Sequence, residues 1–122
     1  MNKSTIYVFI LDLPEFLDTV FVKIPAGYRI NLVTGNEDYS APYEAMSPHG
    51  GRIGLAPQIS MREFIDDSRL NRWFAQNYDL FGCGGVTELC SDITTEEMQR
   101  YSRKVLVGSY LDQTVSSQKY RS

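Results

Sequence analysis

A cysteine and a histidine are the residues of this chain whose types could support nucleophilic catalysis. Cys83 lies among glycines in the run Gly82-Cys83-Gly84-Gly85, and His49, the single histidine, lies in a Pro-His-Gly-Gly loop. A thiol attacks as its thiolate and needs a neighbouring base to hold that form. The spacing does not bring the two residues together, and a cysteine beside glycine is more often a small apolar side chain at a bend. A small enzyme that uses Cys83 and His49 is therefore an alternative and not the main hypothesis.

The same residues do not form a metal or phosphate motif. Cys83 and Cys90 are separated by six residues, which is none of the usual zinc spacings. The glycine clusters at 50–51 and 82–85 lack both the spacing and the Lys-Ser/Thr pair of nucleotide-binding loops. We therefore predict no metal and no cofactor. The N-terminal apolar run is too short for a signal peptide, so we expect a cytoplasmic protein with reduced thiols, although the sequence leaves the state of both cysteines open.

The charge of the chain favours a basic partner. The net charge is −3, and residues 1–100 carry eight Lys/Arg against fourteen Asp/Glu, while residues 101–122 carry four against one. An acidic body lacks the basic footprint of nucleic-acid-binding proteins. The basic residues near Arg100 share a predicted helix face with Glu96 and Glu97, which indicates a solvated, salt-bridged face. No apolar run approaches the eighteen residues of a membrane span, so we expect no membrane association.

Acidic and aromatic residues occur together in two places. Four acids follow the second glycine cluster within ten positions, and two tyrosines accompany an earlier acidic pair. Aromatic anchors beside charges are typical of protein interfaces, where charge steers association. The alternative is that loops and helix starts carry acids for local reasons. The candidate binding residues are Glu88, Asp92, Glu96, Glu97, Tyr39 and Tyr43.

The stretch from Ser60 to Cys90 must position many of these residues. Ser60 and Glu63 fit a capping box, and the apolar residues that follow have helical spacing. A second apolar set begins at Leu70 and lies about half a turn away. We therefore predict two helices, over 61–66 and 68–79, with Asp67 as the cap of the second. One helix buried on both sides is the alternative.

The sequence pattern of the N-terminal third predicts strands. Three β-rich runs, at 5–11, 18–24 and 28–33, are separated by short turns that contain proline or glycine. Short connections favour antiparallel neighbours. We therefore predict an α+β fold, in which an antiparallel β-meander over about residues 4–34 carries two to four helices packed on one face.

The remaining segments complete one domain of 122 residues. A short helix is expected from Ser40 to about Met46, and a fourth short strand is possible over 52–56. Thr94 and Glu97 form a second capping box that opens a helix over about 95–105. The sequence does not decide between helix and strand for 105–115, and the chain ends in a short polar tail from about 116.

These observations predict a small cytosolic binding protein that inhibits or sequesters another macromolecule without catalysis. In size, acidity and lack of motifs the chain resembles bacterial toxin-immunity proteins and phage anti-defence inhibitors, anti-CRISPR proteins included. If the protein acts by inhibition, the acidity of residues 1–100 implies a protein partner with a basic surface. A self-assembling phage or secretion subunit, which would pair an edge strand with a neighbour, is a further alternative. The oligomeric state is left open.

Overall fold

The computed structural model of the chain describes residues 3–35, 40–46, 57–80 and 93–108. These residues form one sheet of four strands in the spatial order β1-β2-β3-β4, and every neighbouring pair is parallel. The strands are β1 Lys3–Phe9, β2 Arg29–Gly35, β3 Leu70–Ala75 and β4 Val105–Val107. The helices are η1 Ile10–Asp12, α1 Leu13–Thr19, η2 Phe21–Lys23, α2 Tyr43–Met46, α3 Met61–Asp66 and α4 Thr95–Ser102. The arrangement is α/β.

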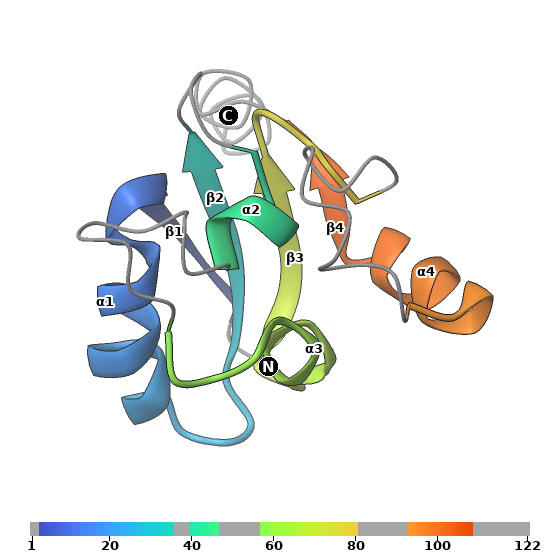
Figure 1. Cartoon of the computed structure of the whole chain (residues 1–122). Helices are drawn as coiled ribbons and strands as arrows, with labels where there is room; N and C mark the ends of the chain where they lie inside the picture. The colour runs from blue at the N-terminus through green and yellow to red at the C-terminus, as the bar shows by residue number, and fades with distance from the viewer. Residues whose placement is uncertain (1–2, 36–39, 47–56, 81–92, 109–122) are drawn as a thin grey trace, which may run out of the picture.

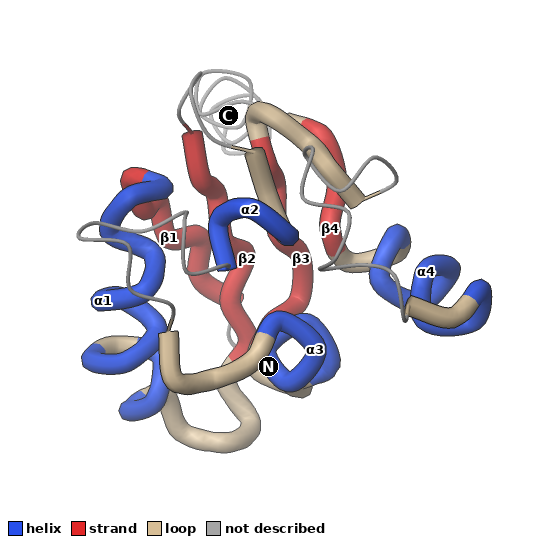
Figure 2. Tube along the Cα trace, in the orientation of Figure 1, coloured by secondary structure: helices blue, strands red, loops and turns tan. Residues whose placement is uncertain are grey.

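The helices lie largely in one layer. Figure 1 shows α1, α2 and α3 over the same face of the sheet, and Figure 2 shows α4 to the side of β4. Parallel neighbours need crossover connections, and right-handed crossovers between strands taken in order place the helices on one face. All four strands therefore end at the same edge of the sheet, the upper edge in Figure 1.

The predicted antiparallel meander is wrong. Its first and third strands exist as β1 and β2, but they pair with each other in parallel. The segment between them is helical because Pro14 lies in the first turn of α1 and the apolar residues Leu13, Phe16 and Leu17 have helical spacing. The alternation over 18–24 was misleading, since Val20 and Val22 are 48% and 54% exposed and do not form a strand face.

The predicted helix over 68–79 is also wrong, although α3 ends at Asp66 as expected. The pairing of β2 with β3 shifts register after Ile30, which leaves one extra residue in β3. Leu70 and Trp73 therefore both face the core although they are three positions apart. Because of this bulge, the buried residues Leu70 and Trp73 of a strand have the three-residue spacing that is typical of one face of a helix. Asp67 does not cap a second helix, and its carboxylate accepts hydrogen bonds from Arg69 instead.

Features that depend on neighbouring residues are confirmed. Both capping boxes are present, at the starts of α3 and α4. The short helix ends at Met46 as predicted. The predicted helix over 95–105 ends at Ser102, and residues 105–107 form β4, one of the two outcomes that the sequence left open. The predicted strand over 52–56 and the tail from 116 lie outside the described residues.

Aromatic side chains join the helices to the sheet. The Phe21 and Phe64 rings meet edge to face with centroids 5.0 Å apart, and Phe64 meets Trp73 in the same way at 5.4 Å. Trp73 is fully buried, and its indole Nε1–H donates to the Thr34 hydroxyl at 3.0 Å. Such pairs add to the free energy of burial when their polar atoms are satisfied. Trp73 thus connects β3, β2 and α3.

Replacement of Trp73 by alanine should reduce the free energy of unfolding by about 3–5 kcal/mol, because the change removes a buried ring and leaves a cavity. Urea denaturation measures the difference, and native tryptophan emission should be blue-shifted. Val22→Ala is the control, since Val22 is 54% exposed and the change should cost less than about 0.5 kcal/mol. Equal effects of the two substitutions would contradict the packing described above.

Candidate functional site

Several polar residues lie close together just beyond the end of β3. The carboxyl ends of all four parallel strands lie at this edge of the sheet. Asp79 follows β3 and is only 3% exposed. Its Oδ1 accepts from the Tyr43 amide at 2.9 Å, and its Oδ2 accepts from the Glu44 amide at 3.0 Å and the Ser40 hydroxyl at 2.8 Å. The Ala41 backbone bonds to residues 77 and 79 nearby. Asp79 thereby holds the start of α2 against the end of β3.

The electrostatics of Asp79 indicate a structural role. Burial raises the pKa of Asp79, and the hydrogen bonds from the Glu44 and Tyr43 amides and the Ser40 hydroxyl oppose that rise. The negative charge of the nearby Glu44 carboxylate raises the pKa of Asp79 further. Glu44 itself accepts from the Ser40 amide at 2.7 Å and from the Ser40 hydroxyl at 3.2 Å. Both Asp79 oxygens already have donors, so the carboxylate is committed to the fold.

The predicted binding residues have different environments. Tyr43 is 1% exposed, so its ring belongs to the core. Glu97 is half-buried and bonded to Thr94, Arg62 and Tyr101. Glu96 is exposed in the first turn of α4. The other predicted binding residues, Tyr39, Glu88 and Asp92, and the alternative catalytic pair, Cys83 and His49, lie outside the described residues, as does Cys90.

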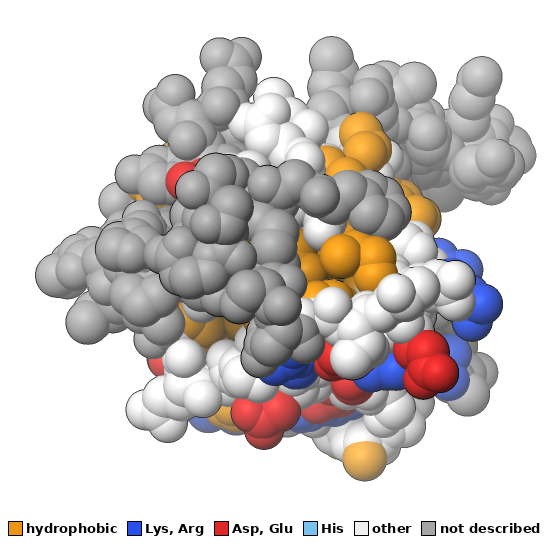
Figure 3. Space-filling view, turned by 45° about the vertical axis from the view of Figure 1, so that its right-hand side comes forward, with side chains coloured by type: hydrophobic (Ala, Val, Ile, Leu, Met, Phe, Trp, Pro, Cys, Tyr) orange, Lys and Arg blue, Asp and Glu red, His pale blue; other side chains and the backbone are white. Residues whose placement is uncertain are grey.

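Charged residues of α3 and α4 pair with each other. Arg100 donates to both oxygens of Asp66, at 2.8 and 3.1 Å, and Arg62 donates to Glu97 at 2.9 Å. Lys104 donates to two carbonyls at the end of α3, at 2.6 and 2.9 Å, and burial lowers its pKa. Figure 3, which brings the α4 side forward, shows acidic and basic side chains interspersed. This face is salt-bridged, but the salt bridges of Arg100 and Glu97 are made to Asp66 and Arg62 of α3 and not within α4.

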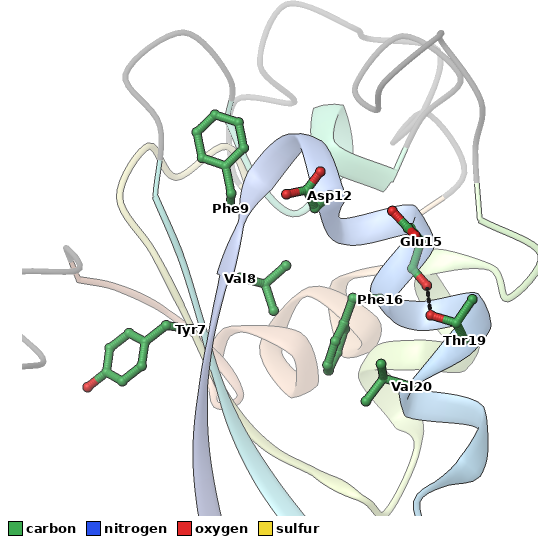
Figure 4. Close-up of a pocket in the computed structure, with 8 residues that line it drawn as sticks. All are labelled: Tyr7, Val8, Phe9, Asp12, Glu15, Phe16, Thr19 and Val20. Carbon is green, nitrogen blue, oxygen red and sulfur yellow. Dashed lines mark hydrogen bonds between the residues drawn. The ribbon is translucent and has the colours of Figure 1, made fainter.

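A groove of about 360 Å³ lies between β1 and α1, and we call it the β1–α1 groove. In Figure 4 the side chains of Val8, Phe16 and Val20 point into the space between strand and helix, while Tyr7 points to the other side of the strand. Val8 and Phe16 are nearly buried and form the floor, whereas Val20 is 48% exposed. The volume is within the range of about 300–1,000 Å³ typical of ligand sites.

One end of the β1–α1 groove is acidic. Asp12 and Glu15 line it near the carboxyl end of β1, and Phe9, 42% exposed, lies beside them. Residues 10–22 contain three acids and no Lys or Arg. The sequence prediction missed this site because it assigned Pro14 and Glu15 to a turn. The available signal was a proline followed by an acid, which is typical of a helix start.

Comparison of the chain with protein-family models, curated proteins and solved structures finds no match. Among the described residues, no group of three or more His, Cys, Asp or Glu is arranged to hold a metal ion. No helix in the same part of the chain has both the length and the apolar character needed to cross a membrane. The assignment of function therefore depends on the geometry of the described surfaces.

Asp79→Asn should lower the free energy of unfolding by about 1–3 kcal/mol at neutral pH. The side-chain NH₂ of asparagine would face N–H or O–H groups that now donate to the carboxylate, and these would lose their acceptor. Glu96→Gln, on an exposed residue, is the control and should be nearly neutral. Folding raises the Asp79 pKa, so this group stabilises the protein most below its unfolded pKa. The stability difference between wild type and Asp79→Asn should therefore narrow as pH rises through the folded pKa. A difference that widens with pH, measured by urea denaturation, would contradict this assignment.

Proposed function

We propose that this protein acts by binding a protein partner with a basic surface, and that the β1–α1 groove is the contact. The observation that carries the proposal is the groove itself, in which Val8 and Phe16 form an apolar floor and Glu15 lies exposed at the acidic end. Protein interfaces combine an apolar centre with a polar rim, and complementary charge accelerates association. A cationic side chain of the partner would meet Glu15 while apolar atoms cover the floor.

The exposure of the lining supports a protein partner over a small molecule. Phe9 and Val20 are 42% and 48% exposed, so the groove is open along its rim. Sites for small molecules usually enclose most of the ligand surface, whereas protein contacts can be shallow. A partner held at its basic surface would be blocked from its own targets. Inhibition or sequestration in the cytoplasm, without a chemical step, is therefore the role that we propose.

Two other surfaces are secondary candidates. The acidic residues around α4, with Glu96 exposed, would serve the same kind of partner. A polar ligand at the carboxyl ends of the strands is less favoured, because ligands of open α/β sheets bind at that edge where the strand order reverses, and the order β1-β2-β3-β4 of the described strands has no reversal.

Reversal of one charge at each acidic surface separates these candidates. With a partner captured from cell lysate and then purified, Glu15→Lys should slow association about tenfold, as expected for reversing one charge near a partner cation. Glu96→Lys is the matched control, also an exposed acid in the first turn of a helix, and should change the rate less than about twofold. Stopped-flow or surface-based kinetics measure both.

The salt dependence completes the test. Raising salt from 0.1 to 1 M shortens the Debye length from about 10 Å to about 3 Å, so wild-type association should slow and Glu15→Lys should respond less. A rate that is lowered by Glu96→Lys and not by Glu15→Lys would move the contact to α4. Binding indifferent to salt and to both substitutions would contradict a basic partner.

A further inference from the structure

A small pocket lies where β2 and β3 begin, at the lower edge of the sheet in Figure 1. Its volume is about 200 Å³, and the described residues that line it are Gly27, Tyr28, Arg29 and Ser68. Gly27 has a φ of 101°, which glycine adopts without strain, and the turn that it forms leads directly into β2. We call this space the turn pocket. It shares no lining residue with the β1–α1 groove.

The side chains of the turn pocket are hydrogen-bond donors. Arg29 contributes a guanidinium, and Tyr28 and Ser68 each contribute a hydroxyl, while the described lining contains no acid. None of these three side chains makes a hydrogen bond or an ion pair in the described part of the chain. Arg29 is half-buried, so its guanidinium is only partly solvated by water. An acceptor that enters the pocket would therefore meet donors that are not engaged elsewhere in the fold.

A second cation lies close to the turn pocket. The Lys104 Nζ donates to the carbonyl of Asp67, the residue directly before Ser68, at 2.9 Å. Burial lowers the pKa of Lys104 most, and the positive charge of Arg29 also lowers it. The two cations are thus near enough to repel each other, and an anion between them would relieve that repulsion.

The carboxylates near these two cations already have other partners. Asp67 accepts hydrogen bonds from the amide and the guanidinium of Arg69, and Asp66 accepts two from Arg100. Each of these acids is therefore paired with its own arginine. Among the described residues, Arg29 and Lys104 have no carboxylate within ion-pair distance, so two positive charges remain without a matching anion.

We infer that the turn pocket binds a phosphate dianion, either as free phosphate or as the phosphate monoester of a small molecule. The Arg29 guanidinium donates to two phosphate oxygens, the Ser68 hydroxyl donates to a third, and Lys104 attracts the anion from further away. A phosphate monoester carries a charge of about −1.5 to −2 at pH 7, which matches two cations better than the single charge of a carboxylate does. This site is separate from the groove of the proposed function.

Titration of inorganic phosphate into the ¹⁵N-labelled full chain, with sodium chloride keeping the ionic strength constant, tests the inference. Amide resonances of residues 25–30 and 67–70 should shift saturably. Acetate and dimethyl phosphate, which each carry one negative charge, should bind at least about tenfold more weakly, a difference of about 1.4 kcal/mol. Equal binding of the three anions, or shifts that leave both segments unchanged, would overturn the phosphate site.

Arg29→Gln tests the contact with the guanidinium, and Arg103→Gln is its matched control. Both substitutions remove one positive charge, but Arg103 is exposed and does not line the pocket. Arg29→Gln should weaken phosphate binding about tenfold or more, because a charge-assisted hydrogen bond is lost, and Arg103→Gln should weaken it less than about twofold. Equal losses would show that only the overall charge matters, and they would overturn the site.

Ser68→Asp tests the pocket at an exposed position, where the substitution should leave the protein folded by urea denaturation. The new carboxylate would repel the phosphate and attract Arg29, so phosphate binding should weaken about tenfold or more. Gln99→Glu is the control, because it adds the same charge at an exposed position of α4 and should change binding less than about twofold. Phosphate binding that Ser68→Asp leaves unchanged would overturn the assignment.

Phenyl phosphate distinguishes the two sources of the dianion. Tyr28 is 47% exposed and lines the pocket, so its ring is available to an organic group attached to the phosphate. Phenyl phosphate that binds at least about threefold more tightly than inorganic phosphate, with the gain lost in Tyr28→Ala, would support a monoester, and equal binding would support free phosphate. Phenyl phosphate binding that Arg29→Gln does not weaken would show an apolar contact alone and would overturn the inference.

Discussion

The fold depends on how the start of β3 is held beside the start of β2, and Arg69 does this. Its guanidinium donates to both carboxylate oxygens of Asp67, at 3.0 and 2.9 Å, and to the carbonyls of Phe21 and Ile24, at 2.9 and 2.8 Å. It also lies 4.2 Å from the centre of the Phe21 ring. A partly buried arginine is tolerable when its donors are satisfied, and this one joins η2, α3 and β3. The chain runs from α1 through η2 to β2, so these contacts hold the segment that follows α1 against the start of β3.

Carboxylates flank β3 at both ends, and their environments differ. Near the start, the hydrogen bond from Arg69 lowers the pKa of Asp67, so its stabilisation is present above the unfolded pKa and is lost as the pH falls through the folded pKa. Beyond the end of β3, burial raises the pKa of Asp79, so its stabilisation is present below the unfolded pKa and is lost as the pH rises through the folded pKa. Between them Leu70, Trp73 and Ala75 are buried, which makes β3 the centre of the core.

The parts of the fold that the sequence predicted correctly depend on neighbouring residues. Capping boxes at Ser60 and Thr94 and the runs of β1 and β2 are encoded within a few positions of each other. The errors came from tertiary effects. The bulge beside Ile30 gave a strand the spacing of a helix, and exposed valines after α1 gave a helical connection the alternation of a strand. Parallel pairing could not be recognised once that connection was taken as a strand.

The candidate site was predictable only in its chemistry. The acidity of the chain follows from its composition, but the position of Glu15 at the end of a groove follows from the packing of α1 against β1. Tyr43 shows the same limit, because an aromatic residue beside acids in the sequence is part of the core in the structure.

Hydrogen–deuterium exchange of the full chain with and without its bound protein partner tests the account most directly. If the partner covers the β1–α1 groove, protection should increase over residues 7–9 and 12–20, which carry its lining, with little change in α4. Protection that increases over 95–102 while β1 and α1 exchange as in the free protein would contradict it.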